Sequence, residues 1–401
     1  PYEKELFLMK RTDCSVDWLF AACAPDTELL PWNAQFTPVD LPHDWQIRHA
    51  DDLYRDGTLF YRKYFFVTDV PGTRRMLWFG GAYMDTTVFV NGTEVGQWKY
   101  GYTSFWFDIT DALHEGQNEV LVRCNLRHPN SRWYSGAGLY RNVELWEAPD
   151  LHLMPDGLYV AAKEGDNGAW TVAVTAEAGS VTAASAGRTL TLHLTDDNGS
   201  LLGTAAIPAD AWAALPSPDG WRTGKETAIY KASHTFTLQD PALWDLDAPN
   251  FYHITAELTG ADGVTDTLTT RFGCRTIEAT PDCGLLVNHK RVLIKGVCIH
   301  HDFGCLGSAF EYSAAKRQLE ILKSMGVNSI RTGHTPPAPQ FMDLADEMGI
   351  LMDVESFDCW RRGKNPYDYG RFFDEWQEKD VAAWIRRDRN HPSLLFWCIG
   401  N

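Results

Sequence analysis

Short runs of alternating hydrophobic and polar residues fill the first part of the chain, and no helical periodicity interrupts them. The clearest of these runs are residues 59–67, 76–79, 86–90 and 119–123. The pair Asn91-Gly92 separates two such runs, which is a strong signal for a β-hairpin. Many short strands without helices are typical of a β-sandwich, so the pattern predicts a jelly-roll domain over residues 1–150.

The same pattern continues over residues 151–283, with Pro, Gly and Asp between the runs. Residues 170–174 and 189–194 alternate cleanly between apolar and polar side chains. The length of this region suits an immunoglobulin-like β-sandwich, although the Cys-Trp-Cys signature of true immunoglobulin domains is missing from it. The sequence therefore predicts a second sandwich of this general architecture.

From residue 284 onward, apolar runs alternate with stretches of helical periodicity. We expect strands at 292–299, 329–331, 350–354 and 394–399, and helices at 313–325, 338–348 and 373–389. Gly326 and Gly349 follow two of these helices, where the residue after the helix end needs a positive φ. Strands that alternate with helices predict a parallel sheet.

Four βα strands in residues 284–401 would make the first half of a (β/α)8 barrel. A closed barrel of eight strands takes about 250 residues. Half a barrel would leave two sheet edges and an apolar interior in water. We therefore expect the natural chain to continue beyond Asn401, so that the fold class is a jelly roll, an immunoglobulin-like sandwich and a truncated TIM barrel.

Charge and cysteine content narrow the possible partners and the compartment. The net charge of −17 argues against binding to nucleic acid or to an anionic membrane surface. No apolar run approaches the ~20 residues that span a bilayer. Nine cysteines without a CxxC pair indicate buried free thiols, for example Cys298 and Cys398, and hence a cytoplasmic protein. No signal peptide is visible, although the first residue is Pro1 rather than Met.

Four segments spread over the chain carry the strongest functional information. They are residues 41–45, 131–141, 328–336 and 389–401. Together they resemble motifs of glycoside hydrolase family 2, which includes β-galactosidases and β-glucuronidases. This resemblance implies a retaining exo-β-glycosidase whose first domain is of the sugar-binding type. The sixteen tryptophans fit sandwich cores, and some of them would suit the flat faces of sugar rings.

The resemblance also implies where the catalytic carboxylates are. The acid/base Glu is expected directly after Asn401 and the nucleophilic Glu much later, with the two carboxyl groups ~5–5.5 Å apart. The pKa of the acid would have to be raised by burial and by its neighbour. No residue of the printed chain is expected to replace either group, so the chain as printed should be inactive.

Three strand ends supply the first substrate-binding candidates. The apolar run before Asn401 would deliver its side chain to the C-terminal mouth of the barrel, where the resemblance implies a hydrogen bond to the sugar 2-hydroxyl. His334 could bind a sugar hydroxyl or a loop carbonyl. His300 and His301 are adjacent and should point to opposite sides of a strand. The resemblance favours His300 as the sugar contact and His301 as a supporting residue behind it.

The strand at 350–354 is followed by acidic candidates. Relatives carry Asp-Glu before a small residue, Phe and Asp, whereas this chain has Val354 at the first position and Asp353 one residue earlier. We therefore carry over only Glu355 and Asp358 as substrate-binding residues. The alternative for each is a salt bridge to Arg331 or to Arg361. Arg331 is itself a candidate because it flanks a strand end.

The jelly roll offers three weaker candidates. Arg132 could reach the barrel mouth and bind a uronic acid carboxylate, or it could pair with an Asp of the site. Asp44 and Trp45 lie in an earlier loop that also resembles the family. No cofactor is expected, and no metal is expected either, because Cys359 and Trp360 stand where some β-galactosidases have magnesium-binding residues.

The favoured function is hydrolysis of terminal β-D-galactosides. The main alternative within the family is a β-glucuronidase or β-galacturonidase. An alternative of another class is a carbohydrate-binding fragment or pseudoenzyme without catalysis. The expected partner is a carbohydrate, with no nucleic acid and no membrane, and a homo-oligomer is possible.

Overall fold

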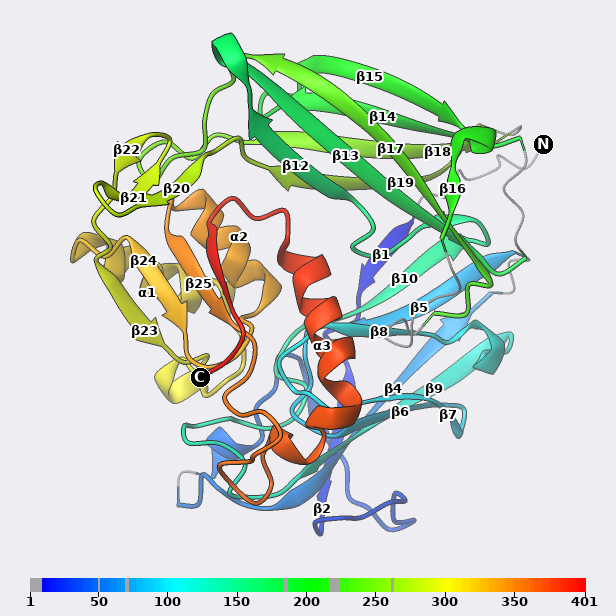
Figure 1. Cartoon of the computed structure of the whole chain (residues 1–401). Coiled ribbons are helices and arrows are strands. Elements are labelled where there is room, and N and C mark those ends of the chain that lie inside the picture. Colours follow the sequence, from blue (N-terminus) through cyan, green and yellow to red (C-terminus); the bar gives the residue numbers. More distant parts are fainter. Residues whose placement is uncertain (1–8, 50, 69–71, 183–186, 216–223, 261–262) are drawn as a thin grey trace.

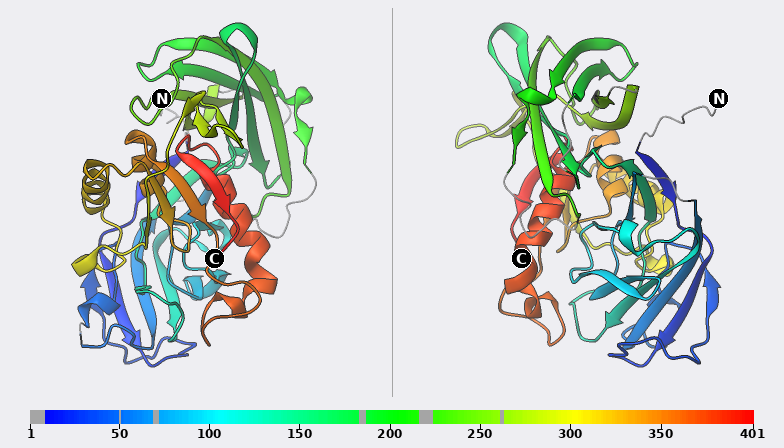
Figure 2. Two further views of the ribbon diagram at one scale, coloured as in Figure 1. Left: turned by 60° about the vertical axis from the view of Figure 1, so that its left-hand side comes forward. Right: turned by 90° about the vertical axis from the view of Figure 1, so that its right-hand side faces the viewer.

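The computed structural model describes residues 9–49, 51–68, 72–182, 187–215, 224–260 and 263–401. Figures 1 and 2 show two β-sandwiches and a β/α segment that packs against both of them. The short 3-10 helices are η1 Gln46–Arg48, η2 Thr110–Ala112, η3 Asp166–Gly168, η4 Ala209–Ala211, η5 Gly304–Leu306 and η6 Tyr369–Arg371. The chain therefore forms the three kinds of unit that its sequence predicts.

The first unit is a jelly-roll sandwich of two antiparallel sheets. One sheet has the order β1-β10-β5-β8 and the other β3-β2-β4-β9-β6-β7. The strands are β1 Lys10–Asp13, β2 Trp18–Cys23, β3 Thr37–Val39, β4 Gly57–Val67, β5 Thr73–Phe79, β6 Thr86–Val90, β7 Thr93–Trp98, β8 Phe105–Asp108, β9 Gly116–Leu126 and β10 Val143–Pro149. The β6–β7 hairpin turns at Asn91 (φ 49°) and Gly92 (φ 80°), which confirms the predicted hairpin.

The second unit is an immunoglobulin-like sandwich whose two sheets enclose Trp170, Leu192 and Ile254. Strands β11, β13, β17 and β16 form one sheet, with β12 also paired to β13, and β15, β14, β18 and β19 form the other. The strands are β11 His152–Leu153, β12 Tyr159–Glu164, β13 Ala169–Ser180, β14 Thr189–Asp196, β15 Leu201–Pro208, β16 Ala213–Ala214, β17 Ala228–Gln239, β18 Tyr252–Gly260 and β19 Gly263–Phe272.

A small antiparallel sheet leads from the second sandwich to the β/α segment. It consists of β20 Ile277–Thr280, β21 Gly284–Val287 and β22 Lys290–Arg291. The expected domain boundary between residues 283 and 284 falls in the turn between β20 and β21. Because both strands belong to one hairpin, this sheet is better described as a connector than as part of either neighbour.

The predicted strand at 292–299 is half as long as expected, since only β23 Gly296–Ile299 is a strand. Asn328 explains the difference. Its side-chain Oδ1 accepts a hydrogen bond from the Lys295 amide at 2.8 Å, and its Nδ2 donates to the Leu293 carbonyl at 2.9 Å. A side chain thus satisfies the backbone groups that a sheet neighbour would otherwise bind.

The β/α segment has four parallel strands in the order β23-β24-β25-β26. The other strands are β24 Ser329–Thr332, β25 Leu351–Glu355 and β26 Leu394–Cys398, and the helices are α1 Tyr312–Ser324, α2 Pro339–Glu347 and α3 Phe373–Asp388. Gly326 (φ 87°) and Gly349 (φ 62°) follow α1 and α2 in the left-handed conformation that the sequence predicts. The order of strands and helices matches half of a β/α barrel.

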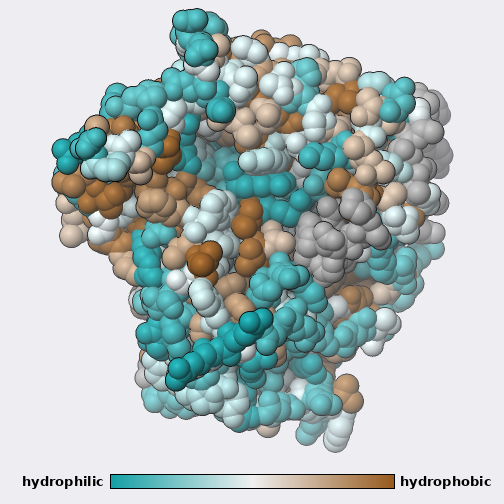
Figure 3. Space-filling model, viewed as in Figure 1, coloured by the Kyte–Doolittle hydropathy of each residue, from teal (hydrophilic) through white to brown (hydrophobic). Residues whose placement is uncertain are grey.

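The two faces of this sheet differ in burial. On the outer face, Ile330, Met352 and Val354 are fully buried in a cluster with side chains of all three helices. On the inner face Phe396 is 53 % exposed, and hydrophobic side chains gather over the β/α segment at the left of Figure 3. Cys298 is exposed and Cys398 half-buried, so the prediction that both thiols are buried is wrong. Both face the inner side of a sheet that no second layer covers in the described residues.

Polar contacts join the β/α segment to both sandwiches. Arg141 of the jelly roll, 2 % exposed, donates hydrogen bonds to the carbonyls of Gly80, Tyr102 and Pro336. Asn390, just before β26, accepts a hydrogen bond from the Val160 amide of β12. All nine cysteines are free of disulfides. Within the described residues, the helices are too short or too polar to cross a membrane.

Candidate active site

The ends of four parallel strands and one jelly-roll loop meet at a single polar cluster. Such strand ends form the mouth of a β/α barrel, where functional side chains collect. The side chains of the cluster are His300 after β23, Arg331 and His334 at the end of β24, Glu355 and Asp358 at the end of β25, Asn401 after β26 and Arg132 from the jelly roll. Seven of the nine predicted binding residues are thus brought together.

Glu355 is the buried centre of the cluster, with no exposed surface. Its Oε2 lies 2.7 Å from Nη2 of Arg331 and 2.7 Å from Nδ1 of His334. Burial of a carboxylate is tolerated when it is paired and hydrogen-bonded, and both conditions hold here. The salt bridge to Arg331, which the sequence left open as an alternative, is therefore the one that Glu355 forms.

His334 is a neutral hydrogen-bond donor to Glu355. Burial lowers the pKa of His334 and outweighs the opposing effect of Glu355. The imidazole donates its Nδ1 proton to Glu355, which leaves Nε2 as an acceptor. An acceptor at this position can receive a hydrogen bond from a sugar hydroxyl.

Trp133 and His300 form an aromatic wall beside the polar cluster. Their rings stack with centroids 5.1 Å apart and 11° between the planes, and Trp133 also meets His334 edge-on at 5.5 Å. The Nδ1–H of His300 donates to the Gly333 carbonyl. His301 points the other way and donates from Nε2 to the Ser135 carbonyl at 3.0 Å, as the alternation along a strand predicts. Burial lowers the pKa of His301 to about 4.

Asp358 binds the jelly roll to the barrel through Arg132. Arg132 donates from Nε to Oδ2 at 3.3 Å and from Nη2 to Oδ1. Lys364 also lies 3.1 Å from Oδ1. Burial would raise the pKa of Asp358, but the hydrogen bonds from Arg132, Asn401 and Lys364 outweigh it and hold this pKa below its usual value. Of the two alternatives for Arg132, the structure contains the pair with a site Asp. Arg361, the other predicted partner of Asp358, pairs with Asp374.

The side-chain amide of Asn401 is held at both ends. Its Oδ1 accepts a hydrogen bond from Nη2 of Arg331 at 3.2 Å, and its Nδ2 donates to Oδ1 of Asp358 at 3.0 Å. A cation on the oxygen and a carboxylate on the nitrogen fix one orientation of the amide. A second donor and a second acceptor position of the amide remain for a ligand.

Asp44 and Trp45 lie outside the cluster. Asp44 is 2 % exposed, and its carboxylate accepts hydrogen bonds from Tyr134 Oη (2.6 Å) and from the amide of Ser308 (2.8 Å). Its contacts therefore join the jelly roll to the loop after β23. Trp45 is 7 % exposed and packs in the jelly-roll core, where it meets His49 edge-on. We do not include either residue in the candidate site.

Sequence reasoning missed three residues at the mouth. Trp133 had a usable signal, because it is the neighbour of Arg132 in a segment that resembles the family. Asp353 shares the inner face of β25 with Glu355, and burial raises its pKa against the effect of Arg331. Lys364 had no signal in the sequence, since it lies in a loop without a recognisable motif.

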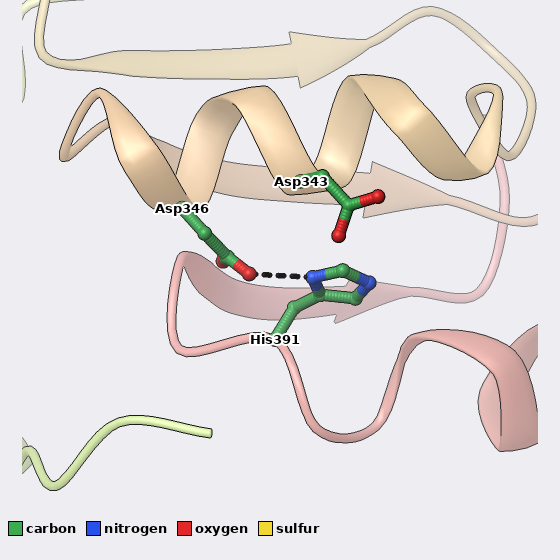
Figure 4. Close-up of side chains that lie close together, drawn as sticks. All are labelled: Asp343, Asp346 and His391. Carbon is green, nitrogen blue, oxygen red and sulfur yellow. Dashed lines mark hydrogen bonds and ion pairs between the residues drawn. The ribbon is translucent and has the colours of Figure 1, made fainter. Parts of the chain in front are cut away.

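A second cluster of titratable groups lies beneath the turn that precedes β26. Figure 4 shows Asp343 and Asp346 of α2 beside His391, with one ligand atom from each within 4.8 Å of the others. Asp346 raises the pKa of His391 to about 9, against the effect of burial. Arg271 lies 3.4 Å from both carboxylates. A protonated His and a guanidinium thus already neutralise the cluster, which favours a structural role over metal binding.

Comparisons with known proteins agree with this architecture. Profiles of three glycosyl hydrolase family 2 domains match consecutive parts of the chain: the sugar binding domain at residues 31–149, the family 2 domain at 156–275 and the TIM barrel domain at 279–401. These matches cover the jelly roll, the second sandwich and the β/α segment in that order.

Curated relatives carry two kinds of name. A β-galactosidase of Bacteroides ovatus is 36 % identical over 98 % of this chain, and a putative β-glucuronidase of Formosa agariphila is 33 % identical over 90 %. A solved family 2 member from Bacteroides cellulosilyticus superposes with a TM-score of 0.87 at 29 % identity over 98 % of this chain. The chain covers 46 %, 34 % and 52 % of these three proteins, so it spans about half their length or less.

Proposed function

This chain belongs to glycoside hydrolase family 2, and we propose that its protein is a retaining exo-β-glycosidase that cleaves terminal β-D-galactosides. The observation that carries the proposal is the Asn401 amide, which Arg331 and Asp358 hold at the barrel mouth. In retaining glycosidases, hydrogen bonds to the 2-hydroxyl strengthen in the transition state. An amide with a fixed orientation can make such a bond without first having to be ordered.

The two catalytic carboxylates are assigned to Glu residues outside the printed sequence. Glu355 already forms a salt bridge with Arg331. Asp358 already forms salt bridges with Arg132 and Lys364. Glu355 ends β25 and Asp358 follows the same strand, whereas the mechanism needs carboxylates on either side of the scissile bond. Relatives of about twice the length leave room for such residues.

The pairing of Arg132 leaves only part of its guanidinium for a uronide, which supports the choice of a galactoside. A guanidinium that binds a uronic acid must offer an unoccupied pair of N–H groups to the carboxylate. In Arg132 one such pair, Nε and Nη2, already binds Asp358, and the Nη1/Nη2 pair is left. The β-galactosidase named above supports the same choice by similarity.

A β-glucuronidase or β-galacturonidase remains the second candidate. Three cations lie at the mouth, Arg132, Arg331 and Lys364, together with the three carboxyl groups of Glu355, Asp358 and Asp353. The remaining N–H pair of Arg132 could bind the carboxylate of an anionic sugar. Relatives named as β-glucuronidases support this candidate.

The test is hydrolysis by the protein that the full gene encodes, assayed with 4-nitrophenyl β-D-galactoside, β-D-glucuronide and β-D-galacturonide. We expect the galactoside to have the highest kcat/KM and the first product to be the β-anomer, as seen by proton NMR. A preference for either uronide would select the second candidate. Binding of galactose without turnover of any substrate would instead indicate a carbohydrate-binding protein.

Asn401→Ala should lower kcat on the preferred substrate by about 10²–10³-fold with a smaller change in KM, because the lost bond is strongest in the transition state. Asn198→Ala, in a turn of the second sandwich between β14 and β15, is the matched control and should leave kcat unchanged. A kcat unaffected by Asn401→Ala would contradict the role given to this amide.

A further inference from the structure

We propose that Lys364 is a positioning residue for the glycosidase reaction, because it holds Asn401 and Asp358 in their places at the barrel mouth. The proposal rests on the proposed function. The Lys364 ammonium donates hydrogen bonds to the main-chain oxygen of Asp358, to Oδ1 of Asp358 at 3.1 Å and to the main-chain oxygen of Asn401 at 3.2 Å. One cation thus joins the segments that follow β25 and β26.

The loop that carries Lys364 is itself fixed. Asp368, 4 % exposed, accepts hydrogen bonds from the amides of Lys364 (2.6 Å), Asn365 (2.7 Å) and Gly370 (2.9 Å). The Tyr367 amide donates to the Pro129 carbonyl of the jelly roll at 3.1 Å. These contacts hold the backbone at Lys364, so its side chain loses less freedom when it binds the strand ends.

The contacts of Lys364 complement those of Arg132. Oδ1 of Asp358 receives hydrogen bonds from Arg132, Lys364 and Asn401. Arg132 holds only the side chain of Asp358, whereas Lys364 also binds the main chain at both Asp358 and Asn401. Without Lys364, Asp358 would keep a cation, and the main chain of Asn401 would keep only the hydrogen bond from its amide to the Phe357 carbonyl.

The chemical consequence concerns the sugar 2-hydroxyl. If Lys364 sets the position of the Asn401 amide, its loss should weaken the bond to the 2-hydroxyl, which is worth most in the transition state. A change of about 1 Å in a positioning group can cost 10²-fold in rate. A substrate without the 2-hydroxyl cannot make this bond and should lose much less.

The experiment compares a 4-nitrophenyl β-glycoside of the preferred sugar with its 2-deoxy analogue in the full-length protein. The measured quantity is kcat/KM for the glycoside divided by kcat/KM for its 2-deoxy analogue. We expect Lys364→Met to lower this ratio by about tenfold or more, and Lys364→Arg to restore part of it because the cation is kept. Lys316→Met, at an exposed position on α1, is the matched control and should leave the ratio unchanged.

Two outcomes overturn the proposal. Equal losses with both substrates would show that Lys364 only supports the fold, and no loss with either substrate would show that it does not act on Asn401. If the wild-type protein hydrolyses neither glycoside, the proposed function fails, and a crystal structure of Lys364→Met decides about Lys364. A shift of the Asn401 amide would then support the positioning role, and an unmoved amide would exclude it.

Discussion

His391 is a single residue whose protonation links stability to pH. Its pKa is raised to about 9 in the folded protein by Asp346, against an ordinary value of 6.5. The raised pKa means that this pair stabilises the fold fully below pH 6.5 and that the stabilisation is lost as pH rises toward 9. We expect a loss of about 2–3 kcal/mol in the free energy of unfolding over this interval.

Urea unfolding at pH 6 and at pH 9.5 measures this effect. In His391→Gln the amide can still donate to Asp346 but does not titrate, so the pH-dependent loss should largely disappear. His114→Gln, at an exposed position, should keep the loss seen in the wild type. The same pH dependence in His391→Gln would show that other groups cause it.

At the scale of residues, the sequence predicts which residues belong to the candidate site better than it predicts which groups they contact. The opposite directions of His300 and His301 follow from the alternation of a strand, and the ends of strands identify Glu355 and Asn401. The partners of Lys364 could not be predicted, because its loop has no periodicity and its contacts depend on where Asp368 and the jelly roll hold it.

Two helix ends provide a matched test at the scale of elements. Gly326 and Gly349 have similar positive φ values after α1 and α2, but a Cβ at Gly326 would meet no atom within 4 Å. A Cβ at Gly349 would lie 2.1 Å from the Leu246 main-chain oxygen. Gly326→Ala should therefore lower the free energy of unfolding by only about 1 kcal/mol, the penalty for a residue with a Cβ in the left-handed conformation. Gly349→Ala should cost about 2–4 kcal/mol, because the backbone contact must also be opened.

Chemical denaturation of the two variants side by side checks this difference. Equal destabilisation would mean that the segment around Leu246 yields easily to the added methyl group. The wild-type contact would then be unimportant for the junction between the second sandwich and α2.

For elements, periodicity and glycine signals were sufficient to predict the β/α order, and the strand at 292–299 shows where they fail. An apolar run indicates burial but does not show whether a neighbouring strand or a side chain satisfies its backbone. Here Asn328 takes the place of a strand at Lys295 and Leu293. Such a long-range side-chain contact cannot be read from local pattern.

Substitution of Arg141 tests how strongly the jelly roll is bound to the β/α segment. Its buried guanidinium binds carbonyls of the jelly roll at Gly80 and Tyr102 and of the barrel at Pro336. Arg141→Met would leave the Tyr102 and Pro336 carbonyls without this donor, whereas Ser104 would still donate to the Gly80 carbonyl. Each unsatisfied carbonyl costs about 1–3 kcal/mol before relaxation. Calorimetry should show a net loss of about 3 kcal/mol or more, with earlier separation of the two units.

Arg361→Met is the matched control for Arg141→Met. Arg361 pairs with Asp374 while its side chain is 79 % exposed. Exposed pairs contribute little, so stability should change by less than about 0.5 kcal/mol. Similar losses of stability in both variants would show that the hydrogen bonds of Arg141 contribute no more than an exposed ion pair.

At the scale of the molecule, composition and strand patterns predict three units but say nothing of their contacts. The loop of Arg132 and Trp133 belongs to the jelly roll by pattern, yet its partners Asp358 and His300 lie in the barrel. The resemblance led us to expect Arg132 at the barrel mouth, and the fold adds which barrel residues this loop contacts.

The pairing of β1 with β10 has a consequence for synthesis on the ribosome. The jelly roll can close once residue 149 has emerged, because β10 ends there. Arg132 and its partner Asp358 are 226 residues apart, which takes roughly 10–45 s to translate at about 5–20 residues per second. During that time the nascent jelly roll presents Arg132 and Trp133 without their barrel partners, so chaperones have access to the surface that later borders the candidate site.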